Sequence, residues 1–120
     1  RCDDPSDPHA EPLQALEAEL QQLRTLAGTP YRLVPLPWAK ARFAPDDGRR
    51  LPATYANFLI LNGAVLMPSY NDPDRDQAAQ QALQLAFPRH KIEAIDCSAL
   101  LLQHGSLHCA TMQIPEAVFR

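Results

Sequence analysis

The sequence has few cysteines, no basic excess and no long apolar run, and each shortage excludes a class of protein. Its three cysteines, Cys2, Cys97 and Cys109, have no paired metal-ligand spacing and are too few for a dense disulfide framework. The 14 acidic residues outnumber the 11 lysines and arginines, and the net charge of −3 argues against a nucleic-acid surface. No apolar run could span a membrane, and no signal peptide is visible. We therefore expect a soluble, cytoplasmic protein with free thiols and no nucleic-acid or membrane partner.

Length and composition indicate one globular domain. The chain has 120 residues, of which 46% are hydrophobic and 21% charged. It begins with Arg1 rather than methionine, and its opening RCDDPSD is typical of a strand end that enters a loop. We therefore expect residues 1–120 to be the C-terminal part of a single, longer domain.

Two helices are predicted. The first begins after acid–proline pairs and ends at Gly28 and Pro30. Its leucines recur at helical spacing and form one apolar stripe, so we expect this helix to lie on a sheet. The stripe consists of Leu13, Leu16, Leu20, Leu23 and Leu26. The second helix has Asp72 as its N-cap and Pro73 at its first position, and Pro88 ends it. Its predicted buried face consists of Ala79, Leu83, Ala86 and Phe87.

Strands are predicted around these helices. Residues 31–37 are a short strand candidate, and residues 38–50 are expected to be a loop with a turn at 47–48. Residues 54–70 predict a β-hairpin with a type I′ turn at Asn62-Gly63, and Pro68 should end its second strand. Residues 90–97 predict another strand, in which Ile92 and Ala94 alternate.

The residues that begin and end the two predicted helices follow the same pattern. An acid–proline pair opens each helix, at Pro12 and Pro73, and a proline followed by a predicted strand closes each one, at Pro30 and Pro88. We therefore predict an α/β fold of two similar units, about 1–61 and 62–120, with more units needed to complete the sheet.

One cysteine stands out in the segment GSLHCATMQIP, residues 105–115. Cys109 between apolar neighbours is either a buried structural thiol in a late strand or a nucleophile. Gly105 would let a ligand approach the backbone. His108 is a poor base for Cys109, because adjacent residues of a strand point to opposite faces.

Other polar residues give weaker evidence for a catalytic or metal site. None of the remaining histidines stands in a His-x-Asp pair, and no spacing suits zinc, so no metal is expected. Helix capping explains the aspartates at 72, 74 and 76. Asn57, predicted mid-strand, needs a partner: it either bonds backbone or points into a pocket.

Taken together, LPATYANFLILNGAVLMPSYNDPDRD (51–76) and GSLHCATMQIP (105–115) resemble the agmatine deiminase family, which includes the bacterial Porphyromonas-type peptidylarginine deiminases. The resemblance implies a pentein-like fold, a five-bladed α/β propeller of β-β-α-β units. This chain would hold about the last two blades. The family uses neither a metal nor an organic cofactor.

The resemblance also implies a reaction. Agmatine, a cationic guanidinium compound, would be hydrolysed to N-carbamoylputrescine and ammonia, a step of putrescine biosynthesis, through a thiouronium intermediate on Cys109. Gly105 matches the nucleophile loop and, with Asn57, is a candidate for substrate binding. The catalytic histidine and the guanidinium-binding acids would lie in earlier blades, so the isolated chain should be inactive. The alternatives are a peptidylarginine deiminase and a non-catalytic, self-associating α/β interaction module.

Overall fold

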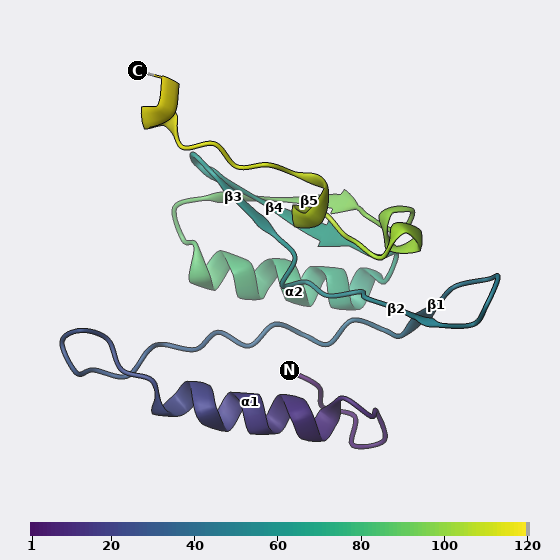
Figure 1. The fold of residues 1–120 in the computed structure, drawn as a ribbon. Coiled ribbons are helices and arrows are strands. Elements are labelled where there is room, and N and C mark those ends of the chain that lie inside the picture. The colour runs from purple at the N-terminus through teal and green to yellow at the C-terminus, as the bar shows by residue number, and fades with distance from the viewer. Residues whose placement is uncertain (120) are drawn as a thin grey trace.

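The computed structural model describes residues 1–119 and has a helix at each side of an extended middle segment (Figure 1). The helices and strands in chain order are α1 (Ala10–Gln22), β1 (Arg42–Phe43), β2 (Arg50–Leu51), β3 (Leu59–Leu61), β4 (Ala64–Ser69), α2 (Pro73–Ala86) and β5 (Lys91–Asp96). Three short 3₁₀ turns follow: η1 (Leu100–Gln103), η2 (His108–Ala110) and η3 (Glu116–Phe119). No helix within residues 1–119 combines the length and the apolar character needed to cross a membrane.

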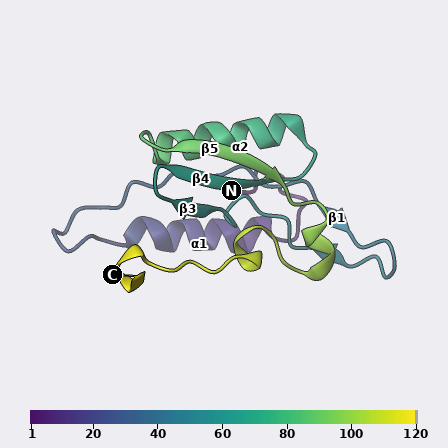
Figure 2. The same ribbon diagram turned by 90° about the horizontal axis from the view of Figure 1, so that it is seen from above.

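The main sheet has three strands in the order β3-β4-β5. β3 and β4 are antiparallel, whereas β4 and β5 are parallel and are joined by α2, since a parallel pair needs a crossover connection. The β-β-α-β order expected from the family resemblance therefore occurs once, over residues 59–96. α2 covers one face of the sheet, and the C-terminal segment runs along the side that carries β3 (Figures 1 and 2).

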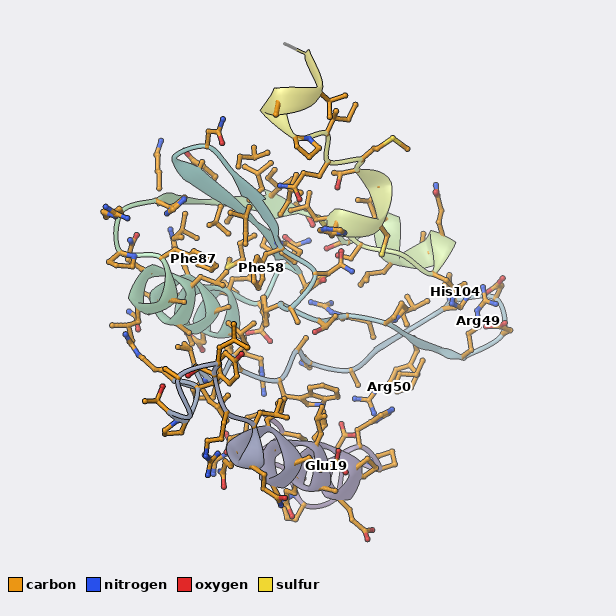
Figure 3. All side chains as sticks on the ribbon, turned by 60° about the vertical axis from the view of Figure 1, so that its left-hand side comes forward. Glu19, Arg49, Arg50, Phe58, Phe87 and His104 are labelled. Carbon is orange, nitrogen blue, oxygen red and sulfur yellow. The ribbon has the colours of Figure 1, made fainter. Side chains whose placement is uncertain are left out.

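The core lies between α2 and the sheet. Ala79 and Leu83 of α2 pack in one buried cluster with Val65 and Met67 of β4 and with Ile92 of β5. The rings of Phe58 and Phe87 meet edge to face across it, with 5.8 Å between their centroids (Figure 3). The buried stripe of α2 advances in steps of four residues. Ala86 is therefore off the stripe and exposed, contrary to prediction, and Ala94 of β5 is exposed as well.

The predicted hairpin is present, but its turn differs. Gly63 has a φ of +81°, whereas Asn62 lacks the positive φ that a type I′ turn requires, so the predicted turn type is wrong. β4 also continues through Pro68 to Ser69. β3 pairs only with residues 64–66, so Pro68 lies where β4 has one neighbour, an edge position that proline tolerates.

The first half of the chain differs most from expectation. α1 ends at Gln22 because Thr25 turns the chain: its backbone N–H donates to Thr29 O (2.8 Å), and the two hydroxyls are 2.8 Å apart. The predicted strand over 31–37 is wrong. This irregular segment runs beside α1 and occupies the place where a sheet was expected (Figure 1). A groove between the two is lined by leucines of the α1 stripe and by Leu33, Val34 and Leu36.

Residues 38–50 are not wholly a loop, because β1 and β2 pair across the predicted turn, where Gly48 has a φ of +69°. An ion pair ties this ribbon to the loop just before α1: Arg50 Nη2 lies 2.6 Å from Asp7 Oδ2. Trp38 Nε1 donates to the same oxygen at 2.9 Å. The Arg50 guanidinium holds the pKa of the Asp7 carboxyl far below its usual range.

Candidate active site

Cys109 lies on a short helical turn with an exposed side chain. It is the middle residue of η2 (His108–Ala110), so the predicted late strand is wrong, and so is the alternative of a buried thiol. The strand argument against His108 as a base therefore does not apply. Within residues 1–119, however, the only side chain recorded in hydrogen-bond contact with Cys109 Sγ belongs to Asn57.

Asn57 holds the Cys109 turn with both ends of its amide. Nδ2 donates to Cys109 Sγ at 3.2 Å, and Oδ1 accepts from the backbone N–H groups of His108 (2.6 Å) and Cys109 (3.4 Å). Asn57 follows a turn at Tyr55-Ala56 and precedes β3, so its predicted place inside a strand is wrong. Of the two interpretations left open by the sequence, the structure favours bonding to backbone, and it adds the thiol as a partner.

These contacts favour the thiolate form of Cys109. Hydrogen bonds from the Asn57 amide and the backbone N–H of Ser106 lower the pKa of the Cys109 thiol. Burial has the opposite effect at Cys97, where it raises the pKa of the thiol. Cys2 is also buried. Among the three cysteines, Cys109 therefore combines solvent access with a stabilised anion, as a nucleophile requires.

Gly105 packs directly against Cys109. A Cβ atom placed on Gly105 would lie 3.2 Å from Cys109 Cβ and 3.9 Å from Sγ, closer to Cβ than side chains ordinarily approach. Gly105 does not have a positive φ; the left-handed residue is its neighbour His104, at φ 59°. The glycine is thus explained by its contact with Cys109, whereas the sequence suggested an approaching ligand.

Beneath the site lies a polar contact that the sequence did not reveal. The hydroxyls of Tyr70 and Ser106 are 2.7 Å apart, and Tyr70 Oη donates to the backbone oxygen of Thr54 at 2.9 Å. Ser106 is 2% exposed and Tyr70 1%. A serine between loop residues gives no local signal of burial, so only the folded structure identifies this pair.

The described residues provide a candidate nucleophile, Cys109, but no evident base beside it. His9 bonds to Asp7, and His90 packs on Phe87, so both are engaged elsewhere. Residues 1–119 contain no group of three or more histidines, cysteines and carboxylates placed to hold a metal ion. Asp72 caps α2 as predicted, accepting from the Arg75 backbone N–H at 3.4 Å.

An exposed thiol with a lowered pKa, carried on a helical turn beside an α/β sheet, has the properties that a cysteine nucleophile needs. The family model for Porphyromonas-type peptidyl-arginine deiminase matches residues 1–115. The chain belongs to this family, which confirms the resemblance noted in the sequence.

Curated relatives are named as agmatine deiminases. A putative agmatine deiminase of Marinomonas sp. is 32% identical over 130 residues, covering 96% of this chain and 35% of the relative. One of Vibrio parahaemolyticus is 37% identical over 128 residues, covering 94% and 35%. The chain thus spans about a third of the length of the curated relatives it matches.

Solved structures of deiminases are similar to this chain as well. A putative arginine deiminase of Porphyromonas gingivalis is 54% identical with a TM-score of 0.90, covering 97% of this chain and 33% of that one. Agmatine deiminase of C. jejuni is 40% identical with a TM-score of 0.78, covering 90% and 31%. A C. jejuni cysteine-to-serine variant with substrate bound is 39% identical with a TM-score of 0.77, covering 89% and 29%. The α/β fold similar to these deiminases is confirmed, with small, open sheets.

Proposed function

We propose that the whole protein is a guanidine-group hydrolase that converts agmatine and water to N-carbamoylputrescine and ammonia, with Cys109 as the nucleophile. The observation that carries this proposal is the exposed Cys109 thiol with the Asn57 amide 3.2 Å from its sulfur and a lowered pKa. The names of the curated relatives favour agmatine as the substrate. One similar structure holds its substrate in a variant in which serine replaces a cysteine. Such trapping is expected when the cysteine is needed for turnover.

The chemistry proceeds in two displacements at the guanidinium carbon. The Cys109 thiolate attacks this carbon and forms a C–S bond; a C–N bond then breaks, and the departing nitrogen takes a proton to leave as ammonia. Water attacks the resulting S-alkylthiouronium, and the C–S bond breaks to release the carbamoyl product and the thiolate. In this chain hydrogen bonds from Asn57 and the Ser106 N–H lower the pKa of the Cys109 thiol and so favour the thiolate before and after the cycle.

The proton donor and the groups that bind the guanidinium would come from elsewhere in the whole protein. We place residues 1–120 in the C-terminal part of one deiminase domain, with units of about 1–61 and 62–120 as the last two blades of a five-bladed propeller. The β3-β4-α2-β5 unit and the one-third coverage of the relatives support this placement. On this proposal the isolated chain is inactive, the whole enzyme is cytoplasmic, and it needs no cofactor.

The reaction is tested by assaying the whole protein with agmatine and with a peptide ending in arginine, side by side. We expect ammonia release with a higher kcat/KM for agmatine. A peptide deiminase is the second candidate, because the matching family model carries that description. A higher kcat/KM for the peptide would replace the first proposal by the second, and ammonia release from neither would contradict both.

A labelling experiment tests the alternative of a self-associating interaction module. Chloroacetamidine, a cationic guanidinium mimic, should alkylate Cys109 of the whole protein, while the buried Cys2 and Cys97 stay unmodified. Neutral chloroacetamide is the matched control, since it has the same leaving group without the cation. We expect faster modification by the amidine, located by peptide mass mapping. An inert Cys109 would contradict the enzyme and favour the module.

A further inference from the structure

We propose that Tyr70 is a positioning residue whose hydroxyl joins the two chain segments that form the nucleophile site. One segment, residues 54–57, contains Asn57, and the other, residues 105–109, contains Cys109. Tyr70 follows the end of β4 and belongs to neither segment, but its side chain is buried between them, and its hydroxyl contacts both.

The hydroxyl contacts each segment directly. Tyr70 Oη donates to Thr54 O at 2.9 Å, lies 3.3 Å from the donating Thr54 backbone N–H, and is 2.7 Å from Ser106 Oγ. Because Oη already donates to Thr54 O, it accepts the hydrogen bond from the Ser106 hydroxyl. One phenolic oxygen thus fixes the start of the Asn57 turn and the start of the Cys109 loop.

Both segments also supply the donors that stabilise the Cys109 thiolate. The Asn57 amide comes from the first and the Ser106 backbone N–H from the second, and hydrogen bonds from them lower the pKa of the thiol. Loss of the Tyr70 hydroxyl would leave the Ser106 hydroxyl without this acceptor in a site that is 2% exposed. The two donors would then be held less firmly relative to the sulfur, with consequences for its protonation.

Tyr55 offers a matched contrast within the same core. It is equally buried, and its ring lies against that of Tyr70 with 5.4 Å between centroids. Its hydroxyl, however, donates to Asp76 Oδ1 of α2 at 2.7 Å and is recorded with no contact to residues 105–109. Tyr55→Phe therefore removes a buried hydroxyl of the same kind without removing the link between the segments.

The experiment compares Tyr70→Phe with Tyr55→Phe in the whole protein, measuring agmatine turnover and the pH dependence of iodoacetamide alkylation of Cys109. The effect on turnover rests on the proposed function, whereas the alkylation profile does not. We expect Tyr70→Phe to lower kcat about tenfold, with a much smaller change in KM. We also expect it to move the alkylation midpoint upward by about half a pH unit. Tyr55→Phe leaves the link in place but releases residues 54–57 from α2, so it should change both quantities by a clearly smaller amount.

The proposal is wrong if Tyr70→Phe leaves the alkylation midpoint in place, or if both variants move it equally. If Tyr70→Phe does not fold, as judged by circular dichroism, Ser106→Ala removes the same bond from the other side and must give the upward shift. When all variants fold, the effects of Tyr70→Phe and Ser106→Ala should be non-additive, and full additivity would contradict the link. A protein without deiminase activity would refute the proposed function, while the alkylation profile would still decide the role of Tyr70.

Discussion

Replacing Cys109 by alanine is expected to abolish ammonia release from agmatine by the whole protein, with kcat falling by at least about 10⁴-fold. On the proposed mechanism the substitution removes the sulfur that attacks the guanidinium carbon and forms the covalent intermediate. Cys109 is exposed, so the truncation leaves no buried cavity and should change the free energy of unfolding very little. The measurements are steady-state ammonia release and thermal unfolding of the same preparation.

Cys2→Ala is the matched control for this prediction. Cys2 is a thiol at the far end of the sequence, buried, with its Sγ 3.5 Å from the backbone oxygen of Asp4. Its replacement should leave kcat unchanged. Turnover that survives in Cys109→Ala would remove the proposed mechanism, even if the protein remained a deiminase.

The second large effect is expected for Asn57→Asp. A carboxylate keeps an oxygen that can accept from the backbone N–H groups of His108 and Cys109, so the turn stays anchored. It loses the N–H that donates to Cys109 Sγ and places a negative charge beside the sulfur. A negative neighbour disfavours the thiolate, so the pKa of Cys109 should rise and the thiolate fraction at neutral pH should fall.

We expect kcat at pH 7 to fall about 100-fold in Asn57→Asp and to recover in part as the pH is raised. The alkylation rate of Cys109 as a function of pH measures the thiol directly. Asn62→Asp is the control, because it adds the same charge at the exposed hairpin turn. An unchanged alkylation profile in Asn57→Asp would mean that the Asn57 amide does not stabilise the anion.

Local sequence signals predicted the second half of the chain well. Asp72 and Pro73 fixed the start of α2, Gly63 fixed the hairpin, and the apolar run after residue 90 became β5. In each case the decisive interaction lies within a few residues along the chain, as a cap or a turn. Such interactions can be inferred from a single sequence.

Two errors in the first half of the chain have different causes, one local and one distant. The leucine stripe predicted a helix to residue 27, but the Thr25–Thr29 turn ends α1 at Gln22. The apolar segment 31–37 lies beside α1 without forming a strand, since no neighbouring strand is present to pair with it among the described residues. Periodicity identifies which residues prefer burial but does not identify the surface that buries them.

The candidate site also has one part that the sequence identified and another that only the fold revealed. Cys109 was identified from its segment, whereas the roles of Asn57 and Gly105 follow from contacts that the sequence could not specify. Asn57 lies 52 residues from Cys109 along the chain, and the Tyr70–Ser106 bond spans 36 residues. A polar residue in an apolar stretch indicates that a partner exists, and only the fold shows that this partner is the Cys109 segment.

The separation of Asn57 from Cys109 along the chain has a consequence for newly made protein. The hairpin, α2 and β5 lie between Asn57 and Cys109 along the chain, so the Asn57 amide reaches the sulfur only when the chain has folded. Before that point the cysteine is an ordinary thiol, mostly protonated at neutral pH and slow to react with electrophiles. The lowered pKa of the Cys109 thiol is thus a property of the folded chain, and it should return toward the ordinary value when the chain unfolds.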